Sequence, residues 1–354
     1  MAETILIINT GNTSTKVGLY TDGREDDVHV IRHSDADLAG FDTINNQKEF
    51  RESLVLGYLN SRGIPVDRLA AIGARGGILK PMESGTYLVN EAMIRDLIEA
   101  RRGAHASHLS AQIGYSLAQQ RKINCYIVDP ITVDEFTSIA RISGHRLFSR
   151  EMRTHALNMK AVARRFASEL RRPYTELSLI VVHLGTGVSV SVHQGGRMID
   201  AVDPSQEGAF SLDRAGGLPI LQVAKKITDE NLTYKAFSRM VFGEGGMYSY
   251  LKTKNFQEVS QRLQDGDQSA EEIVQAMAYQ IAKEIGALST VVSGKLDAIL
   301  FTGGMAYQEY FTDLIKGRVD FIAPVHIYPG EDEIQALAEG VFRVLRGEEA
   351  ARPY

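Results

Sequence analysis

The stretch that decides the fold is Ile180 to Gly187, with the sequence IVVHLGTG. It is an apolar, β-branched run that breaks abruptly into glycine and threonine. Two further stretches repeat this design, ILIINTGNTSTK from Ile5 to Lys16 and AILFTGGM from Ala298 to Met305. A buried strand that ends at glycine lets the next turn bring backbone N–H groups close to a ligand, and Thr or Ser hydroxyls add donors. Such turns bind phosphate. One copy alone is weak evidence, but three copies in one chain indicate a phosphate-binding protein.

Length and composition limit the class of protein. The chain has 354 residues, which predicts two domains, and its 44% apolar and 23% charged residues are typical of a globular protein. A net charge of −5 and a pI near 6.0 argue against a nucleic-acid-binding surface. We therefore expect any bound anion to be met by individually placed arginines.

The beginning of the chain and its cysteine content predict a cytoplasmic location. Glu3 and a four-residue apolar run before Asn9 are unlike a signal peptide, and no apolar run is long enough to span a membrane. Cys125 is the only cysteine, which excludes an intramolecular disulfide and favours a reducing compartment. It lies in an apolar run, so we expect a core residue.

The order of elements is similar in the two halves of the chain. Strands are expected at residues 5–10, 16–20 and 28–32, and again at 180–184, 188–192 and 197–202. We therefore predict an α/β fold of two duplicated domains, with residues 1–145 and 333–354 in the first and residues 146–332 in the second. A helix is expected from Phe41 to Asn60, and another from Ser269 to Val292 that opens with the capping box Ser269-Ala-Glu-Glu272.

Three further segments place polar residues beside expected strands or turns. The short strand Ala70 to Gly73 leads to Arg75, and the buried strand Asn124 to Val128 leads to Asp129. A carboxylate at such a strand end is a catalytic or metal-binding position, or it caps the next helix. The glycine-rich segment 207–219 has neither helical nor strand periodicity and carries Arg214, which is typical of a functional loop.

These motifs, taken together, resemble the superfamily of actin, Hsp70 and sugar kinases. The resemblance implies ribonuclease H-like domains whose two hairpins hold the nucleotide phosphates from opposite sides of a cleft, while the third turn holds the nucleoside. At the level of motifs the chain is similar to the acetate, propionate and butyrate kinase family. The residues implied in binding ATP or ADP are Thr10, Gly11, Asn12, Thr13, Ser14, Lys16, His183, Gly185, Thr186, Gly187, Gly303 and Gly304.

Further matches to this family occur in order along the chain. They imply catalytic roles for Asn9, Arg75, Asp129, His155 and Arg214. Glu333 resembles the family's metal-associated glutamate. With Asp129, it is implied to act on a phosphate-bridging Mg²⁺ through the water molecules of the ion.

The residue types also favour an acid as the phosphoryl acceptor. Kinases of the superfamily commonly carry Asp in the first hairpin, where this chain has Asn9. A fatty acid has a pKa near that of Glu, about 4 to 5, so at pH 7 it is an anion that needs no base. Arg75, Arg214 and His155 would instead hold its carboxylate and spread the charge of the transferring phosphoryl group.

The departures from acetate kinases point toward a longer acid. The chain is shorter, Arg75 runs directly into Gly76-Gly77, and Thr154 stands where acetate kinases carry an aromatic residue. We expect reversible phosphorylation of butyrate or a branched short-chain acid to its acyl phosphate, by a homo-oligomer that is a dimer or larger.

Several alternatives stay open from the sequence. Asn9 would also serve as a turn former, Arg75 and Arg214 as loop ion pairs, and His155 as a helix residue without a ligand. His183 fits phosphate contact and structural hydrogen bonding equally well. The rival functions are a sugar or other hydroxyl kinase, with Asp203 or Asp129 as its base, and an actin- or chaperone-like ATPase.

Overall fold

The structure is a computed structural model that describes residues 2–203 and 205–354. Residues 1 and 204, which fall in the predicted first and second domains, lie outside the described residues. The chain forms two compact units, one of Met1–Val133 with Asp332–Tyr354 and one of Asp134–Glu331. The predicted domain boundary near residue 145 therefore lies within the second unit. The prediction that the second domain binds the nucleotide stays a prediction.

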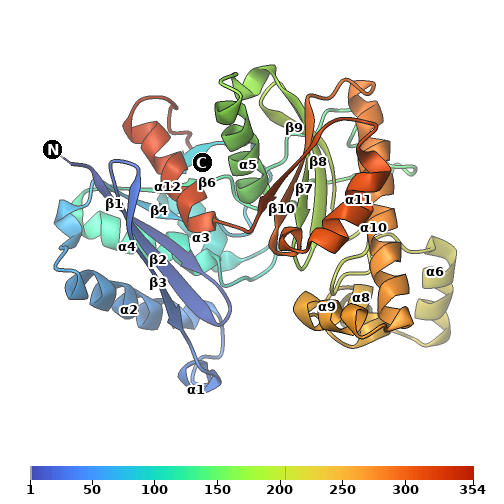
Figure 1. The fold of residues 1–354 in the computed structure, drawn as a ribbon. Coiled ribbons are helices and arrows are strands. Elements are labelled where there is room, and N and C mark those ends of the chain that lie inside the picture. Colours follow the sequence, from blue (N-terminus) through green and yellow to red (C-terminus); the bar gives the residue numbers. More distant parts are fainter. Residues whose placement is uncertain (1, 204) are drawn as a thin grey trace. The chain divides into compact units, whose positions relative to one another are not determined.

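The first unit is built on a six-stranded mixed sheet (Figure 1). Its order is β3-β2-β1-β4-β6-β5. The first three strands are an antiparallel meander, β4 and β6 run parallel to β1, and β5 is antiparallel to β6. The strands are β1 Thr4–Thr10, β2 Ser14–Thr21, β3 Arg24–Arg32, β4 Ala71–Ala74, β5 Thr86–Leu88 and β6 Asn124–Val128.

Helices cover both faces of this sheet. Those of the first unit are α1 Asp35–Leu38, α2 Lys48–Ser61, α3 Glu91–Glu99, α4 His108–Arg121 and α12 Glu333–Leu345, with short 3₁₀ turns at Asn45–Gln47 and Val66–Arg68. Gly114 of α4 faces Ile72 and Cys125, whereas Gly73 faces Val341 of α12. Because neighbouring strand residues point to opposite faces, α4 and α12 lie on opposite sides of the sheet. The predicted core position of Cys125 is confirmed.

The second unit repeats the same sheet with one strand fewer. Its order is β11-β10-β7-β8-β9, again an antiparallel meander followed by parallel strands. The strands are β7 Ser178–Leu184, β8 Val188–Gln194, β9 Arg197–Val202, β10 Ala298–Gly303 and β11 Val325–Pro329. The predicted duplication and the α/β class are confirmed; the nucleotide cleft stays a prediction.

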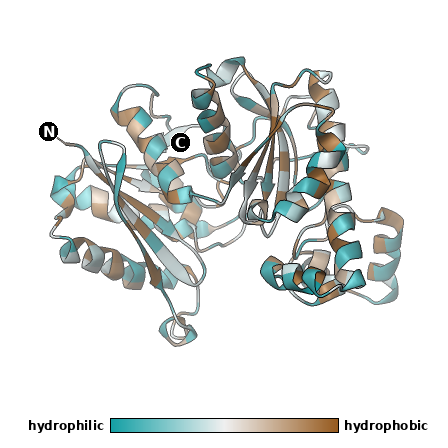
Figure 2. Cartoon of the chain, viewed as in Figure 1, coloured by the Kyte–Doolittle hydropathy of each residue, from teal (hydrophilic) through white to brown (hydrophobic). Residues whose placement is uncertain are grey.

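Two helical layers bury this second sheet. Residues Leu179 and Val181 of β7 pack with α5, and Ile180 and Val182 pack with α10 (Figure 1). In Figure 2 these strands are mostly brown, while α10 mixes brown and teal residues, as expected for a helix with one buried face. The helices are α5 Ala156–Glu169, α6 Ile220–Asp229, α7 Tyr234–Val241, α8 Gly246–Leu251, α9 Phe256–Gln264, α10 Gln268–Ser289 and α11 Glu309–Val319, with 3₁₀ turns at Tyr174–Glu176, Thr290–Val292 and Gly304–Tyr307.

Two local predictions were wrong in detail. Helix α2 begins at Lys48 rather than Phe41, because a separate 3₁₀ turn precedes it. The long helix α10 begins at Gln268, and Asp267 is its N-cap, accepting hydrogen bonds from the N–H groups of Ser269 and Ala270. A carboxylate two residues before the start of the predicted helix thus replaces the expected capping box.

Candidate active site

The parallel strands of the first unit bring three predicted site residues to one edge of the sheet. Asn9 is the residue before the last of β1, Arg75 follows β4, and Asp129 follows β6. The pairs Ile8–Ala74 and Ala74–Ile127 are in register, and the N–H of Arg75 donates to the carbonyl of Ile8. Since carboxyl ends of parallel strands share an edge, residues distant in sequence become neighbours.

Glu333 joins Asn9 and Arg75 into one cluster. Its Oε2 accepts hydrogen bonds from Asn9 Nδ2 and from Arg75 Nη1, both at 2.7 Å. Glu333 begins α12, where the helix dipole favours a carboxylate, and Asp332 caps the same helix. The arginine side chain is 30% exposed, so this ion pair contributes modestly to stability, but it fixes the direction of the guanidinium.

The turn residues of the first hairpin divide into buried and exposed ones. Thr10 is fully buried, and its hydroxyl donates to the carbonyl of Ala106 and also contacts Ser110. The N–H of Gly11 is bonded to the carbonyl of Ser14. Asn12, Thr13 and Lys16 are exposed, with Ser14 half-buried. The exposed residues of the turn are therefore accessible to a phosphate group, whereas the buried Thr10 fixes the hairpin to α4.

Asp129 is held in an unusual backbone conformation. Its φ is +37°, in the left-handed region, and it is 1% exposed. Oδ1 accepts hydrogen bonds from Ser84 Oγ at 2.6 Å and from the N–H of Gly85 at 2.8 Å. Non-glycine residues with such dihedrals cost about 1–3 kcal/mol and concentrate at functional sites.

The second unit places Arg214 directly against the second glycine turn. A side chain at Gly187 would collide with the guanidinium of Arg214, so a larger residue there would displace the arginine. The guanidinium carbon lies 4.5 Å from the centre of the Phe242 ring, and Nε is buried without a hydrogen-bond partner among the described residues. Burial lowers the pKa of Arg214, although Asp213 and Asp203 oppose this. The residue is a cation with unused hydrogen-bonding capacity.

The two predicted histidines stack on one another. The rings of His155 and His183 are 3.8 Å apart and nearly parallel. Nδ1 of His155 is 3.0 Å from Ser189 Oγ, and Nδ1 of His183 is 3.0 Å from Asn158 Oδ1. The buried His183 also lies 3.1 Å from Glu331 through Nε2. Nδ1 of His183 thus has a structural hydrogen bond, while its Nε2 is buried without a hydrogen-bond partner among the described residues, so both alternatives for His183 stay open.

The third glycine turn adjoins the second one. Gly303 has a φ of +94°, and a side chain there would meet the carbonyl of Leu184, the last residue of β7. Gly304 has open space beside it. Strands β7 and β10 pair in parallel, with Thr302 opposite His183, so both turns leave the same edge of the sheet.

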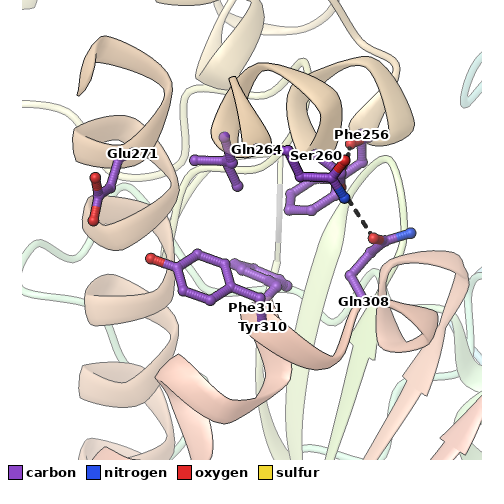
Figure 3. A pocket seen from close by; sticks show the side chains of 8 residues that line it. Phe256, Ser260, Gln264, Glu271, Gln308, Tyr310 and Phe311 are labelled. Carbon is purple, nitrogen blue, oxygen red and sulfur yellow. Dashed lines mark hydrogen bonds between the residues drawn. The ribbon is translucent and has the colours of Figure 1, made fainter. Parts of the chain in front are cut away.

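A cavity of about 460 Å³ lies next to the third turn. Figure 3 shows the rings of Phe256, Tyr310 and Phe311 from α9 and α11 around it, with Glu271 on α10 and Gln308 just before α11. Two of the lining residues are hydrogen-bonded to each other, with Ser260 Oγ donating to Gln308 Oε1 at 3.0 Å. The lining residues are Phe256, Ser260, Leu263, Gln264, Glu271, Gln308, Tyr310 and Phe311. Such a mixture of apolar surface and a few polar groups suits a small-molecule ligand.

The carboxylates fit a magnesium ion that arrives with a nucleotide. No group of three potential ligands occurs within residues 2–203 and 205–354. Mg²⁺ in kinases is commonly held by one or two carboxylates together with substrate phosphates and water. Because Asp129 and Glu333 already accept hydrogen bonds from the protein, contact with the ion through water suits them better than a closed protein site.

His105 is a residue that the sequence argument missed. The residue is exposed to solvent, but the protein atoms around its ring and the positive charge of Arg75 lower its pKa, while Glu333 opposes the change. Its Nδ1 accepts a hydrogen bond from the N–H of Ser107. The ring therefore belongs electrostatically to the Arg75–Glu333 cluster. The sequence signal that could have identified His105 is the pair of histidines just before and at the start of α4. That segment does not follow a strand that ends in glycine, which was the pattern used to select site residues.

Comparison with known proteins gives a consistent picture. The Acetokinase family matches residues 139–312. Butyrate kinase 1 of Clostridium acetobutylicum is 45% identical over 351 residues, which is 99% of each chain. The structure is similar in fold to the acetate kinase of Porphyromonas gingivalis, with a TM-score of 0.79 at 16% identity over 97% of this chain and 100% of that one.

The same fold is found in a propionate kinase from Francisella tularensis, with a TM-score of 0.76 at 17% identity over 96% of this chain and 98% of that one. None of the helices in the described part of the chain has the length and apolar character needed to cross a membrane. Both sheets, the order of the motifs and the full-length similarity agree, and the chain belongs to the acetokinase family.

Proposed function

We propose that the protein is a short-chain fatty-acid kinase that converts ATP and butyrate, or a branched acid of similar size, reversibly to ADP and the acyl phosphate. The observation that carries the proposal is the 45% identity to a butyrate kinase across 99% of both chains. It is a phosphotransferase with a carboxyl group as acceptor. The homo-oligomeric state and the cytoplasmic location remain predictions.

The proposed reaction is a direct transfer. A carboxylate oxygen of the acid forms a bond to the γ-phosphorus of ATP, and the bond from that phosphorus to the β–γ bridging oxygen breaks to release ADP. No proton has to be removed, because the acid is already ionised at pH 7. Mg²⁺, when bound with ATP, would neutralise charge on the phosphate oxygens.

In this reaction the chain's basic side chains are proposed to compensate the charges of two anions. Arg75, aimed by Glu333, would hold the acid's carboxylate. Arg214, with its unpartnered Nε, would meet the charge of the phosphoryl group in transfer. His155, whose ring stacks on that of His183, would add a further contact to the phosphoryl group.

A hydroxyl kinase is less well supported. It needs a general base, and the candidates were Asp203 and Asp129. Asp203 accepts hydrogen bonds from Ser205 and Gln206, and Asp129 from Ser84 and Gly85, so both carboxylates hold their own loops. Incubation with ATP, butyrate and hydroxylamine, with glucose in a parallel reaction, tests the choice. We expect a hydroxamate from butyrate; glucose phosphate, or ADP release without an acceptor product, would contradict the proposal.

The cavity beside the third glycine turn is proposed as the site of the nucleoside of ATP. Gln264 lines it from α9. We expect Gln264→Trp to fill the cavity and raise the KM for ATP about tenfold, with kcat changed less than threefold. Gln261→Trp, on the same helix but outside the cavity, is the matched control. Steady-state kinetics with ATP varied would contradict the assignment if both variants behaved alike.

Thr154 bears on the choice of acid. It is 2% exposed, and its hydroxyl has no hydrogen-bond partner among the described residues. We expect kcat/KM for butyrate to exceed that for acetate roughly tenfold, since two buried methylenes contribute up to about 0.8 kcal/mol each. Thr154→Phe should shift the preference toward acetate, while Thr154→Val, of similar size, should not. Competition between the two acids in the wild-type enzyme checks this, and a preference for acetate would show the reasoning to be wrong.

A further inference from the structure

The first hairpin turn is built around a fully buried arginine. Arg51 of α2 is 0% exposed and among the largest completely buried side chains of the described chain. A buried charge is costly unless an opposite charge or several hydrogen bonds compensate it. The described residues place no carboxylate within ion-pair distance of Arg51. Its charge is therefore compensated by hydrogen bonds alone.

All of these hydrogen bonds go to neutral oxygens, and most of the acceptors belong to the turn. Nη1 donates to the carbonyls of Gly11 at 2.8 Å and Ser14 at 3.0 Å, and Nη2 donates to that of Asn12 at 3.0 Å. Nε and Nη2 also donate to Gln47 Oε1, which fixes the guanidinium from its other side. The turn is thus wrapped over one planar group with a fixed geometry.

The direction of these carbonyls determines the direction of the neighbouring N–H groups. In a planar trans peptide the C=O and the following N–H point in opposite directions. Because the carbonyls of Gly11 and Asn12 point at Arg51, the N–H groups of Asn12 and Thr13 point away from it. Both residues are exposed. Two adjacent outward N–H groups above a buried positive charge form a site suited to an anion.

We infer that Arg51 is a positioning residue for the phosphates of ATP: it orients the turn from Gly11 to Ser14 and supplies positive charge from beneath it. The inference rests on the proposed function, because that function provides the triphosphate. Arg51 does not touch the substrate. Its effect reaches the phosphates through the peptide groups of Asn12 and Thr13 and through its charge.

The test separates phosphate binding from nucleoside binding. Arg51→Met removes the charge and all donors, and Arg51→Lys keeps the charge but cannot hold three carbonyls in one plane. We expect Arg51→Met to raise the KM for ATP and the Kd for tripolyphosphate at least tenfold, and Arg51→Lys about threefold. The KM for butyrate and the Kd for adenosine should stay within twofold. Arg62→Met, which replaces an exposed arginine just after the same helix, should change none of these values.

The outcomes distinguish this inference from the proposed function itself. Tripolyphosphate and adenosine binding are measured by calorimetry on the whole protein, so they need no catalytic activity. If wild-type protein binds tripolyphosphate but forms no hydroxamate, the proposed function fails while the role of Arg51 is still tested. The inference would be overturned if either variant bound tripolyphosphate as tightly as wild type. It would also be overturned if the folded Arg51→Lys protein lost tripolyphosphate binding and adenosine binding equally. Should Arg51→Met not fold, the lysine variant decides.

Discussion

Replacement of Arg214 by alanine is expected to lower kcat by about 10² or more, with the KM for ATP nearly unchanged. The glycine turns contact ATP in the ground state and the transition state alike, whereas the guanidinium is most needed when charge develops on the phosphoryl group. Nε of Arg214 is buried and unpartnered, and the neighbouring Asp213 oxygen is 3.9 Å away. The side chain thus has a free donor to offer. In related phosphoryl transfers such an arginine contributes about 10³ to 10⁵ in rate.

Arg214→Lys should be nearly as severe, because an ammonium cannot reproduce a planar contact with two donors and cannot stack in the same way on Phe242. Arg239→Ala, which removes an exposed arginine, is the control. Steady-state kinetics with each substrate varied in turn would measure the effect. A kcat within about threefold of wild type for Arg214→Ala, worth under about 1 kcal/mol, would rule out the proposed role.

The second large effect is expected at Arg75. Arg75→Ala should lower kcat/KM for the acid by about 10², since a charge-assisted hydrogen bond to a carboxylate is worth about 1.5–3 kcal/mol and part of it acts in the transition state. Glu333→Gln keeps an oxygen acceptor for Asn9 and Arg75 but removes the charge that aims the guanidinium. We expect it to reduce kcat/KM for the acid by a smaller factor, about tenfold.

The two variants also separate the roles considered for Glu333. If the residue serves only to aim Arg75, the dependence of rate on Mg²⁺ concentration should be the same in Glu333→Gln as in wild type. If it also contacts the ion through water, as the resemblance implied, the required Mg²⁺ concentration should rise. Arg95→Ala, at an exposed position of α3, is the control. Arg75→Ala with an unchanged kcat/KM for the acid would exclude the proposed carboxylate contact.

Elements with strong local signals were predictable from the sequence. The hairpins after Ile5 and Ile180 combine continuous apolar strands with glycine turns, and both formed with the expected partners. Segments without such signals were missed. Helices α6 and α7 contain no buried residue, and α9 was not foreseen although it lines the cavity next to Gln308. Over only 10, 8 and 9 residues, an apolar stripe spans too few turns to distinguish a helix from a loop by periodicity alone.

By itself the sequence determined the two duplicated sheets, the three glycine turns and the identity of the polar residues at the strand ends, because these depend on the residue types within a few positions of each other. Only the tertiary structure decided which of these residues meet. Asn9 and Arg75 reach one oxygen of Glu333 across 324 and 258 residues of chain, and Arg214 lies on Gly187. Arg51 had no motif to mark it and came to lie beneath the first turn through the packing of α2. The physical reason is that hydrogen bonds and charges act over a few ångströms in space, whatever the separation along the chain.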